Sequence, residues 1–402
     1  MHLYRRAADL LHRLGLLEAV LQLRRAVTLR TISIVTYHRI ADLDDDDPYD
    51  PEVIDATPAQ FRRHVEMLAR IGTPIGIDTL IRALDGGTLP PNPVMITFDD
   101  GYRSCREVAL PILRRLGVPA TVFVATAFAD QRRLYWWDQI AAVLHLARGR
   151  RAELAYPHPL RIDTNDPGTR RRLTATIKNT RGLDLDRFLR ELRAALRVPW
   201  SPELEARLAA SLIMSWDDIR ALANAGLDVE SHSRDHRVLE TLDGDALCDD
   251  LVGSRRDLEA QLGRPVRAIA YPVGRRPPAR VRRAVAEAGY QIGLTNATGV
   301  NYLWPEAMRP VDPFDLRRIA TDRSHSDAMF LAQLAVPPLA YGSLRLTRRG
   351  SSARQRAAAR ERAAVPPSAT TAGPKAPYEQ SFQPELAAVA ARSSAGTRER
   401  GE

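Results

Sequence analysis

The chain has 402 residues, of which 45% are hydrophobic and 27% charged, with a formal net charge of +9 and a pI of about 9.9. This length and composition predict a folded protein with a sizeable core, in one large domain or two modest ones. The two cysteines, Cys105 and Cys248, exclude a disulfide framework and indicate no particular redox compartment. No run approaches the roughly 18 apolar residues that cross a bilayer, so no membrane span is expected.

Residues 1–30 predict an amphipathic helix. Its sequence, "MHLYRRAADLLHRLGLLEAVLQLRR", mixes arginines through the apolar residues, unlike a secretory signal. Leu10, Leu14, Leu17 and Leu21 fall on one helical face. We expect this face to pack on the domain; the alternative is peripheral contact with an anionic membrane through the surrounding arginines. Without a signal or span, the expected location is the cytoplasm or the cytoplasmic face of a membrane.

Strand and helix patterns alternate from residue 31 onward, which predicts an α/β protein with a parallel sheet or barrel. A long polar, helix-rich segment at about 135–215 interrupts the alternation and is interpreted as an insertion. The predicted strands cover 31–40, 94–98, 119–126, 227–233, 266–274 and 290–296, and the predicted helices cover 57–72, 78–87, 102–117, 215–226, 245–263 and 279–289.

The chain changes character at about residue 342, where large apolar residues become rare and Ala, Arg, Ser and Pro dominate. Such a segment buries too little surface to offset its ordering entropy, so 342–402 is predicted to be a disordered basic tail. The dense charge of Arg345 to Arg362 leaves nucleic-acid binding open as a third hypothesis. No helix-turn-helix, zinc-finger or RNP signature accompanies it, so no specific nucleic-acid partner is expected.

Polar or constrained residues follow three of the predicted strands. "TFDDG" ends in Asp99 and Asp100, "SHSRDH" contains His232 and His236, and "AYPVG" begins at Ala270. In α/β barrels, catalytic groups lie at the carboxyl ends of the strands. An aspartate and two histidines meeting there would form a metal site with open positions, leaving the second aspartate as a base. Each motif alone has a plainer explanation, since Asp-Gly is a common turn pair and HxxxH is often incidental.

In this order the motifs resemble those of the polysaccharide deacetylase family, whose domain is the NodB homology domain and which is grouped with carbohydrate esterase family 4. "TFDDG" matches the first motif, "SHSRDH" the second and "AIAYPVG" the third. "IVTYHRI", "TPAQFRRHVEMLARIG", "LYWWDQI" and "MSWDDIRALANAG" are similar to an exopolysaccharide-linked subgroup. The resemblance covers roughly 31–320, within a deacetylase domain expected at 31–341.

The resemblance implies a distorted (β/α)₇ barrel and a hydrolase that acts on a carbon–nitrogen bond other than a peptide bond. Asp99 would be the general base, and Asp100, His232 and His236 would hold one divalent metal, with zinc expected and cobalt, nickel or manganese as alternatives. A backbone N–H near Tyr271 and Pro272 would face the oxyanion. The substrate would be an N-acetylated saccharide or polysaccharide, and the products acetate and a free amine.

The chain departs from the family pattern in two places. Ala270 stands where many members carry an arginine that orients the base, and Arg318 is the suggested replacement. The late Leu-x-His that supplies the general acid is absent, and His38 becomes the candidate acid or substrate ligand, with a purely structural role as the alternative. The rival to a working deacetylase is a carbohydrate-binding protein that kept the fold and lost turnover.

Overall fold

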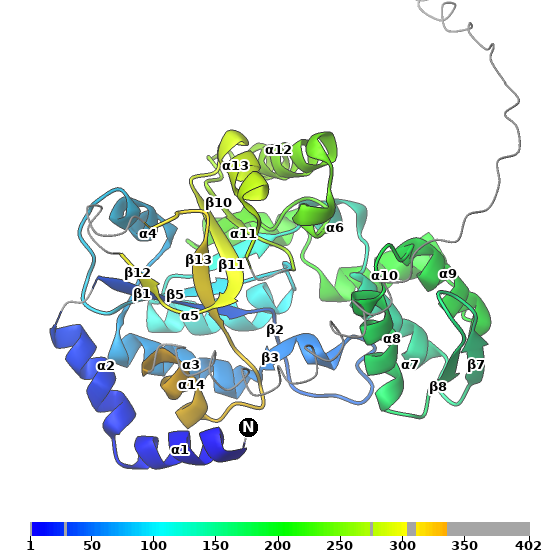
Figure 1. Cartoon of the computed structure of the whole chain (residues 1–402), viewed down its shortest axis with the longest axis horizontal. Helices are drawn as coiled ribbons and strands as arrows, with labels where there is room; N and C mark the ends of the chain where they lie inside the picture. The colour runs from blue at the N-terminus through cyan, green and yellow to red at the C-terminus, as the bar shows by residue number, and fades with distance from the viewer. Residues whose placement is uncertain (1, 28–29, 274–275, 304–310, 336–402) are drawn as a thin grey trace, which may run out of the picture. The chain divides into compact units, whose positions relative to one another are not determined.

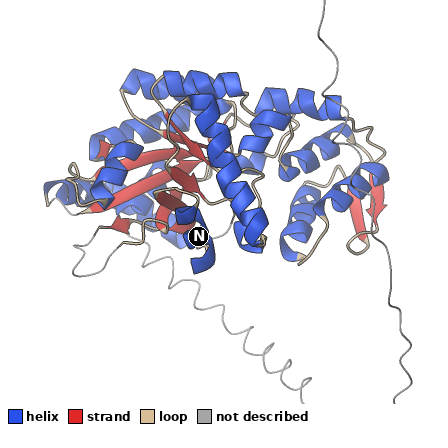
Figure 2. Ribbon diagram, turned by 90° about the horizontal axis from the view of Figure 1, so that it is seen from above, coloured by secondary structure: helices blue, strands red, loops and turns tan. Residues whose placement is uncertain are grey.

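The computed structural model describes residues 2–27, 30–273, 276–303 and 311–335, and the predicted tail at 342–402 lies outside these residues. Figure 1 shows the strands with helices around them, and a further group of helices beside them that includes α8 (Gly168–Asn179), α9 (Leu185–Ala195) and α10 (Pro202–Leu212). Figure 2, seen from above, shows the same strands enclosed by helices. No helix within the described ranges is long and apolar enough to cross a bilayer.

Seven parallel strands close into a barrel within the described residues, which confirms the (β/α)₇ prediction. The sheet is closed because β1 pairs with both β5 and β13, the first and the last of the other six strands in barrel order. In barrel order the strands are β1 (Thr31–Tyr37), β5 (Pro93–Phe98), β6 (Thr121–Val124), β9 (Asp228–Ser231), β10 (Ala268–Ala270), β11 (Ile292–Thr298) and β13 (Leu316–Ala320).

Four short strands accompany the barrel. They are β2 (Arg39–Ile40) paired with β3 (Ile54–Ala56), β4 (Thr73–Pro74) beside β5, and β12 (Asn301–Tyr302), antiparallel to β1. Strands β1, β5 and β6 are buried at every position, as strands of a parallel barrel covered by helices are. Val35, Ile96 and Val122 pack against the surrounding helices, whereas their neighbours Ile34, Met95 and Phe123 belong to a second cluster.

The helices around the barrel follow the predicted order. Thr57 begins α3 with a capping box that includes Gln60, as the "TPAQ" sequence predicts. The predicted helix 102–117 instead forms a π-helical turn (Cys105–Ala109) before α5 begins. The helices are α3 (Pro58–Ile71), α4 (Ile77–Leu84), α5 (Leu110–Leu116), α6 (Thr126–Gln131), α11 (Trp216–Asn224), α12 (Gly244–Leu262), α13 (Ala279–Glu287) and α14 (Asp327–Ala335), with short 3₁₀ turns at Pro51–Val53 and Leu239–Thr241.

The predicted insertion forms a helical lobe with a hydrophobic core of its own, in which Phe188 and Leu192 are fully buried. It also contains an antiparallel hairpin that the sequence analysis did not foresee. The lobe consists of α7 (Trp136–Leu146), β7 (Arg151–Leu154), β8 (Leu160–Asp163), α8 (Gly168–Asn179), α9 (Leu185–Ala195) and α10 (Pro202–Leu212).

The single helix predicted at the N-terminus is wrong in detail. Gly15 adopts a left-handed conformation (φ +67°) and separates α1 (His2–Arg13) from α2 (Leu16–Ala26). The break divides the predicted leucine stripe, because Leu17 and Leu21 are buried whereas Leu10 and Leu14 are exposed. Both helices pack against α14, and α2 also packs against α3.

Candidate active site and metal centre

Two aspartates, Asp99 and Asp100, follow strand β5, and their backbone conformations differ. The amide of Asp99 donates to the carbonyl of Tyr37 at 2.9 Å, so Asp99 continues the pairing with β1. Asp100 and Gly101 then both have positive φ, +68° and +67°, and the chain turns sharply. The turn that "DDG" predicts is therefore present, but both carboxylates are buried, which a solvent-exposed turn would not require.

Strand β9 delivers the two histidines. The amide of His232 donates to Val124 of β6 at 2.8 Å, directly after the last residue of the strand. His236 follows a short loop, has a φ of +51°, and its amide donates to the Ser233 hydroxyl at 3.1 Å. This loop directs both imidazoles toward the end of β5.

Asp100, His232 and His236 converge as predicted. The Oδ1 atom of Asp100 lies 3.2 Å from Nε2 of each histidine, and the three candidate ligand atoms lie within 4.8 Å of one another. His232 also uses its Nδ1 atom in a 2.9 Å hydrogen bond with the carbonyl of Ala270. A carbonyl accepts only, so Nδ1 carries the proton and Nε2 presents its lone pair.

The three side chains fit a divalent metal. Asp100 Oδ1 is buried and has no hydrogen-bond partner, although each polar atom in an interior normally has one. A carboxylate oxygen with two imidazole nitrogens is a donor set suited to zinc and to related divalent ions. A metal bound at this point would satisfy the unpaired oxygen.

Arg318 of β13 lies against Asp99. Its Nη1 atom donates to Oδ1 and its Nη2 atom to Oδ2, both at 2.7 Å, so the pair is bidentate. Both side chains are 1% exposed. Arg318 therefore contacts Asp99, as its suggested replacement of the third-motif arginine requires; the replacement itself stays a prediction.

Every guanidinium hydrogen of Arg318 has an acceptor. Besides Asp99, the group donates to the Thr295 carbonyl, the Thr36 hydroxyl and the Asn296 side chain. Burial alone would raise the pKa of Asp99, but the charge and hydrogen bonds of Arg318 lower it below its ordinary value. Asp99 is therefore an ionised carboxylate in a fixed orientation, as a general base requires.

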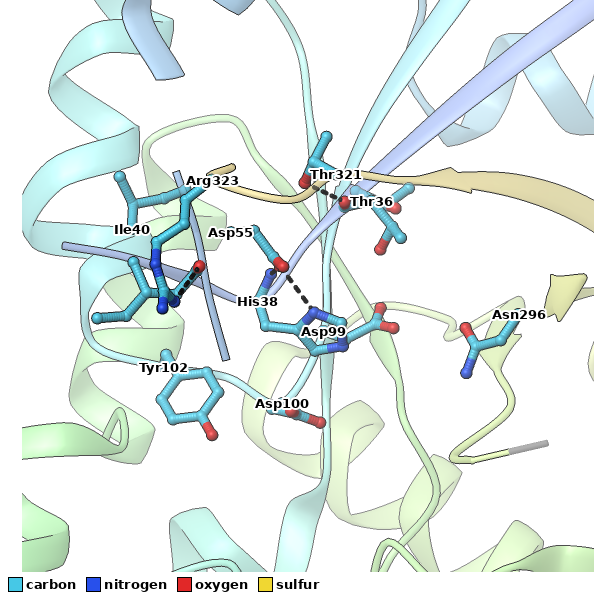
Figure 3. Close-up of polar contacts among 12 residues, drawn as sticks. Thr36, His38, Ile40, Asp55, Asp99, Asp100, Tyr102, Asn296, Thr321 and Arg323 are labelled. Carbon is cyan, nitrogen blue, oxygen red and sulfur yellow. Dashed lines mark hydrogen bonds and ion pairs between the residues drawn. The ribbon is translucent and has the colours of Figure 1, made fainter. Parts of the chain in front are cut away.

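His38 lies at the end of β1 and pairs with Asp55 of β3. The Asp55 Oδ2 atom accepts from the His38 amide at 2.6 Å and lies 2.8 Å from its Nδ1 atom. Figure 3 shows the ring between Asp55 and Asp99, with Asp100 drawn below it. Burial lowers the pKa of His38, but Asp55, with added effects of Asp100 and Asp99, raises it to about 10. His38 is thus protonated near neutral pH.

The comparison with protein families agrees with this geometry. The model of the polysaccharide deacetylase family matches residues 86–159 and 170–293, which include the aspartate pair, both histidines and the third motif. The chain belongs to the polysaccharide deacetylase family. Among curated proteins there is no match.

Solved deacetylases are among the structures that are similar to this chain. The deacetylase PplD of Streptococcus pyogenes, solved in complex with acetate, is 18% identical; the match covers 76% of this chain and 99% of that one, with a TM-score of 0.51. A polysaccharide deacetylase from Bacillus cereus is 16% identical, with 76% and 69% of the two chains covered and a TM-score of 0.48. At 18% identity the likeness to PplD concerns the fold alone.

The third motif of this family member lies beside the candidate metal centre through Ala270, whose carbonyl accepts a hydrogen bond from His232. The Tyr271 amide donates to Leu294 in the sheet at 2.9 Å, and its hydroxyl donates to the Phe314 carbonyl. Pro272 has no N–H to give. Neither of the two residues named for the oxyanion therefore has a free amide hydrogen to offer it.

The residue directly before the lobe has a contact that the sequence analysis did not assign. Tyr135, 1% exposed, donates its hydroxyl hydrogen to the Asp100 carbonyl at 2.7 Å. Its ring stacks on Trp137 with a centroid distance of 4.7 Å and meets His236 edge-on at 5.2 Å. The "LYWWDQI" stretch resembles the exopolysaccharide-linked subgroup, but its sequence does not predict a contact with Asp100.

The other end of the lobe joins the same turn. The Met214 amide donates to the Gly101 carbonyl at 3.0 Å, and the Arg103 amide donates to the Leu212 carbonyl at 2.8 Å. The backbone on both sides of Tyr102 is therefore held by the exit from the lobe, while Tyr135 holds Asp100 from the entrance. The lobe is thus bonded to the turn that carries the candidate metal ligand.

Proposed function

We propose that this member of the family removes N-acetyl groups from a saccharide or polysaccharide and releases acetate. The observation that carries the proposal is the bidentate contact of Arg318 with Asp99, next to the cluster of Asp100, His232 and His236. It supplies a fixed base beside a metal-binding set, which are the two components that metal-assisted amide hydrolysis needs.

Asp100, His232 and His236 would hold one divalent ion, with zinc expected and cobalt, nickel or manganese as alternatives. When bound, such an ion polarises a carbonyl and lowers the pKa of water. Asp99 takes the proton of the attacking water, and Arg318 keeps both of its oxygens in place. Oriented this way, the carboxylate needs no rearrangement before it accepts the proton.

His38 is the proposed general acid. Its paired carboxylate keeps the ring protonated, and it lies near the two aspartates of β5. The water oxygen joins the acetyl carbon, the carbon–nitrogen bond breaks, and His38 gives its proton to the departing sugar nitrogen. The products are acetate and an amino sugar. The Asp55 carboxylate then faces the neutral ring and favours its reprotonation.

The test is acetate release from N-acetylglucosamine oligomers of increasing length and from lipid-linked N-acetylated sugars. Each substrate is assayed with untreated protein, after chelation, and after return of zinc, cobalt, nickel or manganese. The proposal expects release that chelation abolishes and one of these metals restores. Binding of an oligomer without release from any substrate would instead support the carbohydrate-binding alternative.

A further inference from the structure

The N-terminal hairpin of α1 and α2 has one buried side and one uncovered side. Ala8, Leu17 and Leu21 are buried and belong to the main core, to which α14 and α3 contribute. The same hairpin carries six of the ten exposed large hydrophobic side chains found in the described residues. They are Leu10 (58% exposed), Leu14 (62%), Leu16 (46%), Val20 (42%), Leu23 (62%) and Val27 (55%).

These six residues, here called the apolar face, follow helical spacing. Leu10 and Leu14 are four residues apart, and Leu16, Val20, Leu23 and Val27 are separated by four, three and four. The two series meet at the turn through Gly15, and Figure 1 shows both helices at the outside of the molecule. Single exposed aliphatic residues are ordinary, but this many within one hairpin mark an interaction surface.

The charges around the apolar face have one sign. Arg5, Arg6, Arg13 and Arg25 are exposed on the same two helices. The acidic residues of the hairpin are both half-buried and engaged: Asp9 accepts from the Ser326 hydroxyl, and Glu18 pairs with His12 at 2.7 Å. Residues 4–27 therefore offer apolar side chains and cations, with no exposed carboxylate between them.

We propose that the apolar face docks the enzyme on an anionic lipid bilayer. The aliphatic side chains would enter the boundary between headgroups and acyl chains, and the arginines would contact lipid phosphates. A second copy of the chain is a poorer occupant, because a two-fold contact would bring the same arginines together. This surface goes beyond deacetylation, since none of its residues belongs to the active site.

The first test is flotation of the full chain with vesicles of phosphatidylcholine alone or mixed with an equal amount of phosphatidylglycerol. We expect binding to the mixed vesicles. Leu14→Ser combined with Leu23→Ser should weaken it about tenfold or more, because two largely exposed leucines lose their transfer into lipid. The matched control is Leu43→Ser with Leu146→Ser, which changes exposed leucines outside the hairpin and should bind normally.

The arginines are tested separately. Replacing Arg5, Arg6 and Arg13 by glutamine should weaken binding to the mixed vesicles roughly fivefold per residue. The basic segment at Arg345–Arg362 could also attract these vesicles. Full retention of binding in the double-leucine variant would therefore attribute attachment to charge alone and overturn the proposal.

A spectroscopic test reports insertion directly. Cys248, the exposed cysteine, is replaced by serine, and an environment-sensitive fluorophore is attached through Leu14→Cys or, as a control, Leu43→Cys. We expect a blue shift with mixed vesicles only for the label at 14. An unshifted label at 14 on vesicle-bound protein would contradict docking through this face.

Two further measurements separate this proposal from the others. All variants should release acetate from a soluble oligomer as the unchanged protein does. The vesicle test does not depend on this activity, so failure of the deacetylase proposal and failure of the membrane proposal can be told apart. Sedimentation velocity without lipid should show no association that Leu14→Ser with Leu23→Ser removes. Such association, without vesicle binding, would assign the apolar face to a second copy and overturn the membrane proposal.

Discussion

Arg318 and Asp99, which are 219 residues apart in sequence, form a buried bidentate pair at the two strands that flank β1 in the barrel. Such a pair orients a carboxylate more strictly than a single hydrogen bond does. The pair is also costly to break, because either partner alone would be a buried charge without compensation. The same contact thus contributes to the orientation of the proposed base and to the integrity of the barrel.

Arg318→Lys should lower acetate release by about 10²-fold or more, because lysine cannot donate to both carboxylate oxygens in one plane. It should also raise the pKa of Asp99, so the acidic limb of the pH–rate profile moves to higher pH. Arg317→Lys, next along the chain and exposed, is the control. An unchanged acidic limb in a folded Arg318→Lys protein would show that Arg318 does not control the pKa of the proposed base.

Asp55→Asn tests the acid. Without this carboxylate the pKa of His38 should fall from about 10, and the basic limb of the pH–rate profile should move to lower pH. His38→Gln should lower the rate about 10²-fold or more at every pH. An unchanged basic limb in Asp55→Asn would indicate that His38 has a structural role only. The control for His38→Gln is His158→Gln, at an exposed histidine of the lobe.

Much of the fold and of the candidate metal centre was predictable because the relevant residues directly follow strands that the sequence predicts. Asp99, Asp100 and His232 each adjoin such a strand, so their meeting at one end of a barrel follows from topology. The break at Gly15 was not predicted, since glycine is tolerated in a helical pattern and only its positive φ reveals the turn.

The residues that support the site were harder to foresee. Arg318 lies on β13, a short strand that the sequence analysis left unassigned, so its contact with Asp99 remained a suggestion. Asp55 lies on a three-residue strand after an acidic loop, and Tyr135 precedes a lobe. Contacts of this kind depend on how separate segments pack, and no local periodicity encodes that packing.

Tyr135→Phe should weaken metal binding about 10- to 100-fold, as loss of an outer hydrogen bond commonly does. The change removes only the hydroxyl that holds the Asp100 carbonyl, and the ring contacts with Trp137 and His236 remain. Competition with a chromogenic chelator measures the affinity without reference to turnover. The control Tyr156→Phe, elsewhere in the lobe, should bind metal as tightly as the unchanged protein does. Equal metal affinity in the two variants would show that the Tyr135 hydroxyl does not support the metal ligand.

His64 should make the fold sensitive to acid. It is buried, stacks on Phe330 at 4.0 Å, and lies 3.0 Å from the Tyr37 hydroxyl through Nδ1. Burial lowers its pKa to about 4, although Asp327 opposes the shift. A histidine with a lower pKa when folded binds fewer protons than in the unfolded chain. Its contribution is therefore retained above a pH of about 6.5 and lost as the pH falls toward about 4.

The loss attributable to His64 should be about 3 kcal/mol between neutral pH and the acid limit. His64→Gln should be less stable at neutral pH, because it loses the stacked ring, but its stability should decline less steeply with acid. Urea unfolding at a series of pH values gives both curves. The prediction fails if the two proteins lose stability in parallel, and His158→Gln provides the reference for an exposed histidine.

The adjacent aspartates give the most discriminating comparison. Asp99→Asn keeps the shape of the side chain but cannot take a proton, so it should retain the metal and lose about 10²- to 10⁴-fold in rate. Asp100→Asn replaces an anionic ligand by a neutral one, so metal content and acetate release should fall together, and added metal should restore part of the activity. Asp85→Asn, at an exposed helix end, is the control for a change of charge alone.

If "DDG" were only a turn, asparagine would serve at both positions, because it tolerates the positive φ of Asp100. Elemental analysis and acetate release on the same preparations distinguish these outcomes: a fall in rate with full metal in one variant, and a joint fall in the other, assign the two roles. Near-normal turnover in Asp99→Asn would remove it as the base, and near-normal turnover in both would leave the pair as a turn.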